Sequence, residues 1–422
     1  MIRLIQFELK KMFRSNFFRI MLLAFCIFLV AYYVFVNLNT TRVEELITDA
    51  ERTVQISTEN LEQLRESLDS SDGNEKKQIE DDLEFWGNWS KEDEIMLKAY
   101  QEEDWKTLLN QAIAKDENFM DERSSDDYYT SSWPTLFTTE TRIEEYRWLV
   151  ERGIAPILPY DFWSHMTIYD MDFPVEGGSE EDHKAMIVKL STKYSSAGVY
   201  YLNHFFLLLF GVYGVLFFLF LFGDIVTKEG LGRNGPIHLL QTQPIRRDRV
   251  LLSKFFTVLI ASAFILVGTG IISLVLGTIF DSFGYWNYPV LIYGEDYSYT
   301  FMNMSAFIFK SAILFFMILF FCYSILFLFS ILTKRASIAL GLTVATIIMG
   351  IKLSEESVLT GLAPYIPFNY FSVPQVLTME LAVSLKNFDF SYTNALTGLG
   401  IASFIILVLT YIVSVTQYKF GR

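Results

Sequence analysis

Two long hydrophobic runs separated by a short polar segment set the strongest limit on how this chain can fold. Residues 199–223 and 255–280 are each apolar over the roughly 20 residues that a helix needs to cross a ~30 Å hydrocarbon core. Residues 224–254, which lie between these runs, are therefore expected at one face of a membrane. Basic side chains outnumber acidic ones in this segment, and short loops rich in Lys and Arg are retained in the cytoplasm. We expect this segment on the cytoplasmic side.

Four further hydrophobic runs bring the number of expected spans to six. They cover residues 17–37, 306–332, 336–353 and 395–415. Residues 1–16 are basic and place apolar side chains at three- and four-residue steps, which predicts an amphipathic elbow helix along the inner leaflet. A secretory signal would also begin this way, but residues 17–37 are long enough to span and no small-residue cleavage motif follows. The expected fold class is an α-helical integral membrane protein.

The acidic residues are concentrated in one segment, residues 38–198. This segment holds 37 of the 48 acidic residues and only 16 basic ones. Of the 18 Lys and Arg residues outside it, 15 fall on the expected cytoplasmic side, so we expect both termini in the cytoplasm and an acidic extracellular domain. Cys26 and Cys322 both lie in hydrophobic runs, so no disulfide framework is expected in that domain.

A heptad repeat opens the acidic domain and predicts one long helix. Its apolar or small residues alternate steps of four and three: Val43, Ile47, Ala50, Val54, Ser57, Leu61, Leu64 and Leu68. The partner of this helix is either a second copy of the chain or the next helices of the same domain, and short turns favour the second. Further helices are expected over residues 75–86, 90–100 (capped by Ser90), 104–113 and 140–152, and short strands within 154–178.

No catalytic or nucleotide-binding motif emerges from the sequence. His165 and His183 lack an H-E-x-x-H partner. Glycines within 230–235 have the spacing of nucleotide-binding loops, but a membrane span precedes them, and Pro236 and Ile237 stand where a phosphate loop needs Lys and Ser or Thr. We expect no enzyme, no metal site and no nucleic-acid partner. The acidic surface either attracts a cationic ligand such as a basic peptide or is simply solvated.

Residues 224–254 resemble the coupling element of type-2 ATP-binding-cassette (ABC) exporter permeases. The shared pattern is an acidic residue, a glycine, two leucines, a proline, an arginine and a lysine that begins the next span: Glu229, Gly235, Leu239, Leu240, Pro244, Arg247 and Lys254. The resemblance implies a short helix over residues 237–243, stopped by Pro244, that docks into a groove on a separate ATPase subunit. Residues 236–238 depart from the Thr-Leu-Glu-like trio that is commoner in the family. A basic loop that only fixes topology is the alternative.

The same resemblance implies a function. The chain would be the permease subunit of an exporter that moves a peptide, antibiotic, lipid or ion out of the cell. It would pair in the lipid bilayer with a second copy of itself or with a related permease, and with two ATPase subunits. ATP and magnesium would bind to the ATPase, so no cofactor is expected here. Residues 354–394 resemble the re-entrant outer helices of the family. The alternative function is a non-transporting regulator that transmits ATPase motion to an extracellular cell-wall enzyme, although such relatives usually have four spans.

Polar and small residues inside the spans give further expectations. Lys310 and His204 are candidates for a substrate pathway, because ionisable groups within a membrane are usually functional. Lys310 lies near the end of its span, however, and could instead extend its ammonium group to the interface. Ser337, Gly341 and Ala345 repeat every four residues, which predicts that residues 336–353 form a core helix approached closely by another helix.

Overall fold

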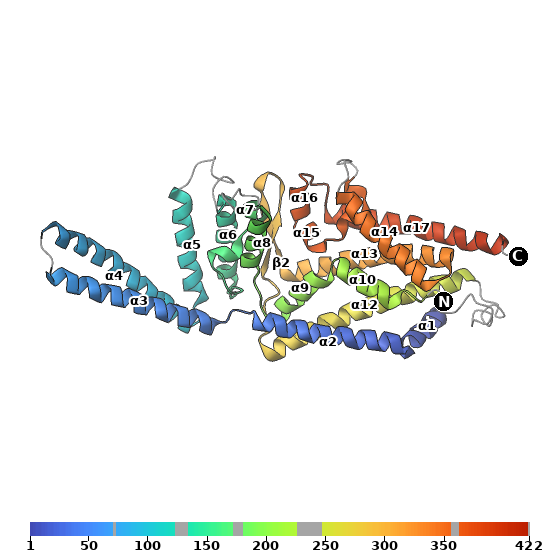
Figure 1. Ribbon diagram of the computed structural model, residues 1–422, viewed down its shortest axis with the longest axis horizontal. Coiled ribbons are helices and arrows are strands. Elements are labelled where there is room, and N and C mark those ends of the chain that lie inside the picture. The colour runs from blue at the N-terminus through green and yellow to red at the C-terminus, as the bar shows by residue number, and fades with distance from the viewer. Residues whose placement is uncertain (71–72, 123–133, 172–179, 226–246, 356–362, 421–422) are drawn as a thin grey trace. The chain divides into compact units, whose positions relative to one another are not determined.

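The computed structural model describes residues 1–70, 73–122, 134–171, 180–225, 247–355 and 363–420 (Figure 1). The chain divides into two compact units. Met1–Val36 and Ser196–Arg422 form the first, here called the membrane unit, and Asn37–Ser195 form the second, called the polar unit. Within the described residues, five helices are long and apolar enough to cross a membrane, and a bent pair of helices brings the number to six if it counts as one span. The helical membrane fold is therefore confirmed.

The membrane unit is built around one buried helix, α13 (Met304–Thr333). Of the 18 consecutive residues of α13 that are most apolar, 61% are buried. In the corresponding stretches of α14 (Ala336–Glu355) and α17 (Tyr392–Phe420) only 17% are buried. α13 packs against both of these helices and against α12 (Arg247–Phe280). A buried hydrogen bond of 2.7 Å joins Tyr323 on α13 to Ser262 on α12. A polar pair of this kind fixes the register of two helices where apolar contacts alone would let them slide.

Two helices precede this core in the sequence. α1 (Ile2–Arg14) ends at Ser15, whose extended backbone separates it from α2 (Asn16–Leu38). The expected N-terminal helix is thus present, while its position along the inner leaflet stays a prediction.

The expectation for residues 336–353 was wrong in one respect. A Cβ added at Gly341 would meet nothing within 4 Å, so the small-residue stripe of α14 receives no close neighbour from the described parts of this chain.

The expected span over residues 199–223 is broken into two helices. α9 (Gly198–Leu209) and α10 (Val212–Phe222) are inclined at 74° to each other, with Phe210 and Gly211 at the break. The break depends on a glycine. A Cβ at Gly214 would lie 1.9 Å from the carbonyl oxygen of Leu209, so no larger residue fits while the bend is kept. Hydropathy does not reveal this bend because both halves are strongly apolar.

Two regions of the membrane unit consist of short elements and not of long helices. Strands β1 (Pro289–Tyr293) and β2 (Tyr299–Asn303) pair antiparallel between α12 and α13, with Leu291 opposite Phe301. Further along the chain, the described part of residues 354–394 forms the turns and helices η4 (Ala363–Tyr365), η5 (Pro367–Tyr370), α15 (Val373–Leu377) and α16 (Glu380–Ser384). The Tyr293 N–H donates to the Thr378 carbonyl at 2.9 Å, which ties the hairpin to this segment.

The polar unit is mainly helical. Its elements are α3 (Val43–Ser70), α4 (Asn74–Gln101), α5 (Trp105–Glu122), α6 (Leu136–Arg152), η2 (Phe162–His165), α7 (Ile168–Met171) and α8 (Glu180–Ser191). The heptad helix is confirmed as α3, and it lies beside α4 of the same chain (Figure 1). The described part of 154–178 holds helical turns and no strand.

The expectation of two helices within residues 75–100 was wrong. α4 is continuous, and Ser90 and Asp93 lie buried in its interior and do not cap a new helix. The physical reason is a second heptad, which the capping pattern obscured. Ile79, Leu83, Trp86, Ser90, Asp93, Leu97 and Tyr100 repeat at steps of four and three, and all are buried or half-buried.

The glycine at the helix break gives a testable prediction. We expect Gly214→Ala to destabilise the protein by about 1–3 kcal/mol, the usual cost of overpacking a close-packed site. Gly268→Ala on α12 is the matched control, because a Cβ there would meet nothing within 4 Å and alanine favours helix. The measurement is the apparent melting temperature of each purified variant in one detergent. Equal melting temperatures for Gly214→Ala and the parent protein would contradict the bend.

Candidate functional site

The expected coupling element lies almost entirely outside the described residues. Five of its residues fall within 226–246: Glu229, Gly235, Leu239, Leu240 and Pro244. Arg247 is the first residue of α12. The structure therefore describes the two ends of this segment, Gly223–Ile225 after α10 and the first turns of α12.

Lys254 joins these two ends. Its ammonium group donates a hydrogen bond of 3.0 Å to the carbonyl oxygen of Ile225. Lys254 is only 3% exposed, so the contact is shielded from water. A charged donor strengthens such a bond. The contact therefore ties Ile225, just after α10, to the first turns of α12.

The N-terminal helix contributes to the same end of the membrane unit. α1 packs against α12, and a small pocket opens between α1 and the end of α10. Glu8 and Lys11 of α1 line this pocket together with Asp224 and Ile225, which directly precede the coupling segment. Glu8 is 6% exposed, although it lies on a helix expected at a membrane surface. The charged groups of α1 thus lie beside the anchor of the coupling segment.

The two candidate pathway residues are placed on different helices. His204 lies on α9 and Lys310 near the start of α13, and both are half-buried. The Lys310 ammonium lies 5.8 Å from the ring centroid of Tyr392, the first residue of α17. This distance fits a cation–π contact at the end of the span. The contact accounts for Lys310 without a substrate pathway, which stays an untested prediction for both residues.

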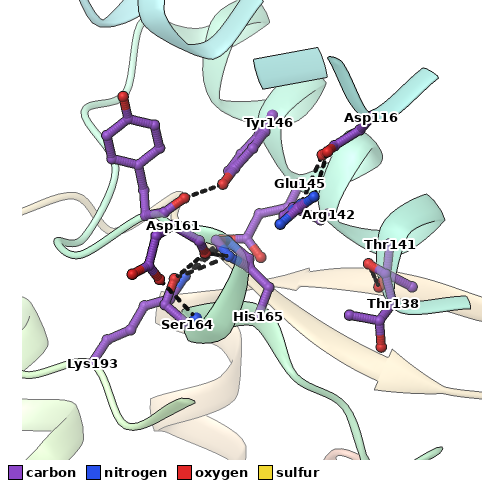
Figure 2. A network of polar contacts seen from close by, with 11 residues as sticks. Asp116, Thr138, Thr141, Arg142, Glu145, Tyr146, Asp161, Ser164, His165 and Lys193 are labelled. Carbon is purple, nitrogen blue, oxygen red and sulfur yellow. Dashed lines mark hydrogen bonds and ion pairs between the residues drawn. The ribbon is translucent and has the colours of Figure 1, made fainter. Parts of the chain in front are cut away.

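A buried polar network joins α5, α6 and η2 of the polar unit (Figure 2). Arg142 on α6 donates two hydrogen bonds to the carboxylate of Asp116 on α5, one of them 2.7 Å long and both side chains largely buried. Burial nevertheless raises the pKa of the Asp116 carboxyl, although the guanidinium of Arg142 opposes the rise. The bidentate geometry fixes α5 to α6.

His165 lies at the heart of the same network. Its Nδ1 is 2.9 Å from the carbonyl oxygen of Asp161, and its Nε2 is 2.9 Å from the ammonium nitrogen of Lys193. A neutral ring that donates from Nδ1 to Asp161 and accepts at Nε2 from Lys193 satisfies both contacts. Glu145 lies close to the pair, with Oε1 3.6 Å from Nε2 of His165 and 3.8 Å from Nζ of Lys193.

This environment favours the neutral form of His165. Burial is the main cause that lowers the pKa of the imidazole, and the positive charge of Lys193 lowers it further, while Glu145 opposes both. Burial also lowers the pKa of Lys193. Sequence reasoning missed the network, because its members come from α5, α6, η2 and the segment after α8. No local spacing marks them, and only the absence of an H-E-x-x-H partner for His165 was visible.

A second buried carboxylate anchors the start of α6. Asp170 accepts hydrogen bonds from the backbone and hydroxyl of Thr135 at 2.8 and 3.0 Å, and from the backbone and hydroxyl of Thr167 at 2.8 and 3.0 Å. Thr138 donates to it as well. With its acceptor sites filled, Asp170 is a structural clamp between α6 and α7. Among the described residues no group of His, Cys, Asp or Glu could hold a metal ion.

Comparison with known protein families identifies the family of this chain. The family model described as "ABC-2 family transporter protein" matches residues 2–422. The chain belongs to the ABC-2 transporter family. Searches of curated proteins and of solved structures return no significant match.

The family that residues 224–254 predicted is thereby confirmed over residues 2–422. This ABC-2 protein is a multi-pass membrane permease, the transmembrane component of an ABC transporter, and its family works with an ABC ATPase subunit. Permeases of this family are generally non-catalytic transmembrane components. The network stabilises the polar unit of the permease.

The network predicts a pH response of that unit. The folded-state pKa of His165 is depressed, so below the ordinary value of about 6.5 the unfolded chain binds a proton that the folded protein excludes. Stability contributed by the neutral ring is therefore lost as the pH falls below about 6.5, at about 1.4 kcal/mol for each unit of depression. Asp116, whose pKa is raised, contributes with the opposite sign at lower pH.

The test compares the parent permease with His165→Gln, which keeps Asp116 and Arg142. Hydrogen exchange of α6 in the full chain, corrected for intrinsic exchange rates, gives the local opening free energy. We expect it to fall between pH 7 and pH 5.5 in the parent and to fall less in the variant. The same slope in both proteins would show that His165 does not carry the response.

Proposed function

We propose that this permease is an exporter subunit that moves its substrate outward when a separate ATPase binds and hydrolyses ATP. The observation that carries the proposal is the buried hydrogen bond between Lys254 and Ile225, which lie on either side of residues 226–246 in the sequence. A segment that receives motion from a partner has to pass it to the spans. Anchored ends do so, whereas a loop that only fixes topology does not need a buried charge at its base.

The transmission path follows from the packing. Displacement of the coupling segment moves the end of α10 and the start of α12 together. α10 and α12 both contact the buried helix α13. The break at Phe210 and Gly211, where the two halves meet at 74°, would let α10 change its angle to α9. The membrane unit can then respond to the ATPase by tilting one half of a broken span.

The orientation rests on the distribution of basic residues. Both termini and residues 224–254 would lie in the cytoplasm, and the acidic polar unit would lie outside the cell. ATP and magnesium would bind to the ATPase and not to this chain. A second permease copy would complete the transporter, and the weakly buried helices α14 and α17 offer it apolar surface. The exported substrate would be a peptide, an antibiotic, a lipid or an ion.

The regulator is the second candidate. It requires only that ATPase motion reach the polar unit, with no passage through the membrane. The short helices within residues 363–384, which contact α13 and α17, favour the exporter, because four spans would suffice for a regulator.

The coupling assignment predicts the effect of a double substitution. Leu239→Asp with Leu240→Asp would bury unpaired charge in the ATPase groove, at a cost of several kcal/mol. We expect ATPase association to fall at least ~100-fold, while the permease still inserts and folds. Co-purification of the ATPase from membranes gives the readout.

Arg246→Ala is the matched control, because a rim charge contributes little to an interface. Normal ATPase retention by this variant and loss by the double variant are expected together. Retention of the ATPase and of transport-coupled hydrolysis by the double Asp variant would remove the basis for the coupling assignment.

A further inference from the structure

One outward face of α4 in the polar unit carries large aromatic side chains exposed to solvent. Phe85 is 57% exposed and Trp89 is 45% exposed. Their ring centroids lie 5.8 Å apart, and Trp86 lies 6.4 Å from Trp89, so the rings form one cluster. Phe85 and Trp89 are four residues apart and share one helix face. Single exposed apolar residues are common on proteins, whereas a cluster of exposed aromatic rings in contact with one another indicates a binding surface.

The same face carries carboxylates at both ends of the aromatic cluster. Asp81 precedes Phe85 by four residues and Glu92 follows Trp89 by three, so all four lie along one stripe of α4. Both acidic residues are exposed. They are eleven residues apart, which corresponds to about 16 Å along a helix axis. We name Asp81, Phe85, Trp89 and Glu92 the α4 stripe.

The ring of Trp89 already has one positively charged neighbour within the chain. The ammonium of Lys115, on α5, lies 5.9 Å from the ring centroid of Trp89. This is cation–π distance, and Lys115 is itself exposed. Nearly half of Trp89 remains open to a second group. The ring is therefore set in surroundings that favour positive charge.

Charge decides which occupant fits the stripe. The helices α3 and α4 hold sixteen acidic and six basic residues, and residues 80–94 alone hold seven acidic residues and one lysine. A second copy of this hairpin would be repelled, and so would an anionic lipid surface. A partner with cationic groups on either side of an apolar centre complements the stripe at each position.

We propose that the α4 stripe is a docking site for a cationic amphipathic peptide. The apolar centre of the peptide packs on Phe85 and Trp89, and basic side chains about 16 Å apart pair with Asp81 and Glu92. The acidic field of the hairpin raises the local concentration of such a peptide and speeds its association. The proposal deepens the exporter assignment by naming a ligand class for the polar unit, but its test needs no ATPase. Failure of one therefore leaves the other standing.

The test uses the full permease in nanodiscs of zwitterionic lipid and a fluorescein-labelled amphipathic peptide of Lys and Leu. Fluorescence anisotropy gives the affinity, with empty nanodiscs subtracted. We expect the Lys and Leu peptide to bind, and a Glu and Leu peptide of the same length not to bind. Asp81→Lys with Glu92→Lys should weaken binding about tenfold or more, because two attractive pairs become repulsive.

The matched control is Glu80→Lys with Glu94→Lys. These residues are exposed, lie on the same helix and change the net charge equally, but helical geometry places them on the other flank of α4. We expect this pair to reduce affinity far less. Phe85→Ala with Trp89→Ala should also weaken binding about tenfold, since truncated aromatic anchors account for most interface energy.

All of these side chains are exposed, so the variants should fold, which size-exclusion chromatography and circular dichroism of each protein verify. Equal losses in the two charge-reversed pairs would reduce the effect to the overall acidity of the unit and overturn the site. Unchanged affinity in the double alanine variant would overturn it as well, and so would equal binding to empty nanodiscs.

Discussion

The burial of α13 is the constraint on which the rest of the membrane unit depends. In hydrocarbon, helices gain nothing from hiding apolar surface from lipid, so close packing and internal hydrogen bonds have to hold them together. α13 supplies both. Tyr323 bonds to Ser262, and Phe315 stacks on Phe210 at 4.7 Å, at the break between α9 and α10. α13 thus supports the bent span at its break, and α9 and α10 each contact α13.

In the proposed mechanism, the Lys254 contact and the bend between α9 and α10 act together. Lys254 fixes the base of the coupling segment, and Gly214 permits the sharp turn that separates α10 from α9. A rigid, continuous second span would transmit a push along its whole length. The broken span confines the motion to α10 and its neighbours, which is how an ABC-2 permease could convert a small displacement by an ATPase into a change of access.

Much of the fold could be predicted from the sequence, because hydropathy and periodicity are local properties. The six hydrophobic runs and the heptad of α3 needed no knowledge of distant residues. The break at Phe210 and Gly211 was not predictable in this way, since it depends on how Gly214 meets the Leu209 carbonyl. The continuity of α4 was missed because Ser90 imitates a helix cap while serving as a heptad position.

The candidate site could also be predicted only in part from the sequence. The coupling residues were recognisable as a linear pattern, but the contact of Lys254 with a main-chain oxygen leaves no trace in the sequence. The network of His165, Glu145 and Lys193 escaped for a similar reason, because its partners converge only in the folded unit. The α4 stripe follows a helical period, yet its exposure distinguishes it from a core face, and exposure is a property of the structure.

The central claim is that the polar unit and the coupling segment lie on opposite sides of the membrane, and cysteine labelling tests it most directly. In a Cys26→Ser, Cys322→Ser background, Glu66→Cys places a thiol on exposed α3 and Arg233→Cys places one in the coupling segment. The account predicts that an impermeant maleimide labels the first variant in intact cells and both variants after permeabilisation. Labelling of the Arg233→Cys variant in intact cells would contradict it.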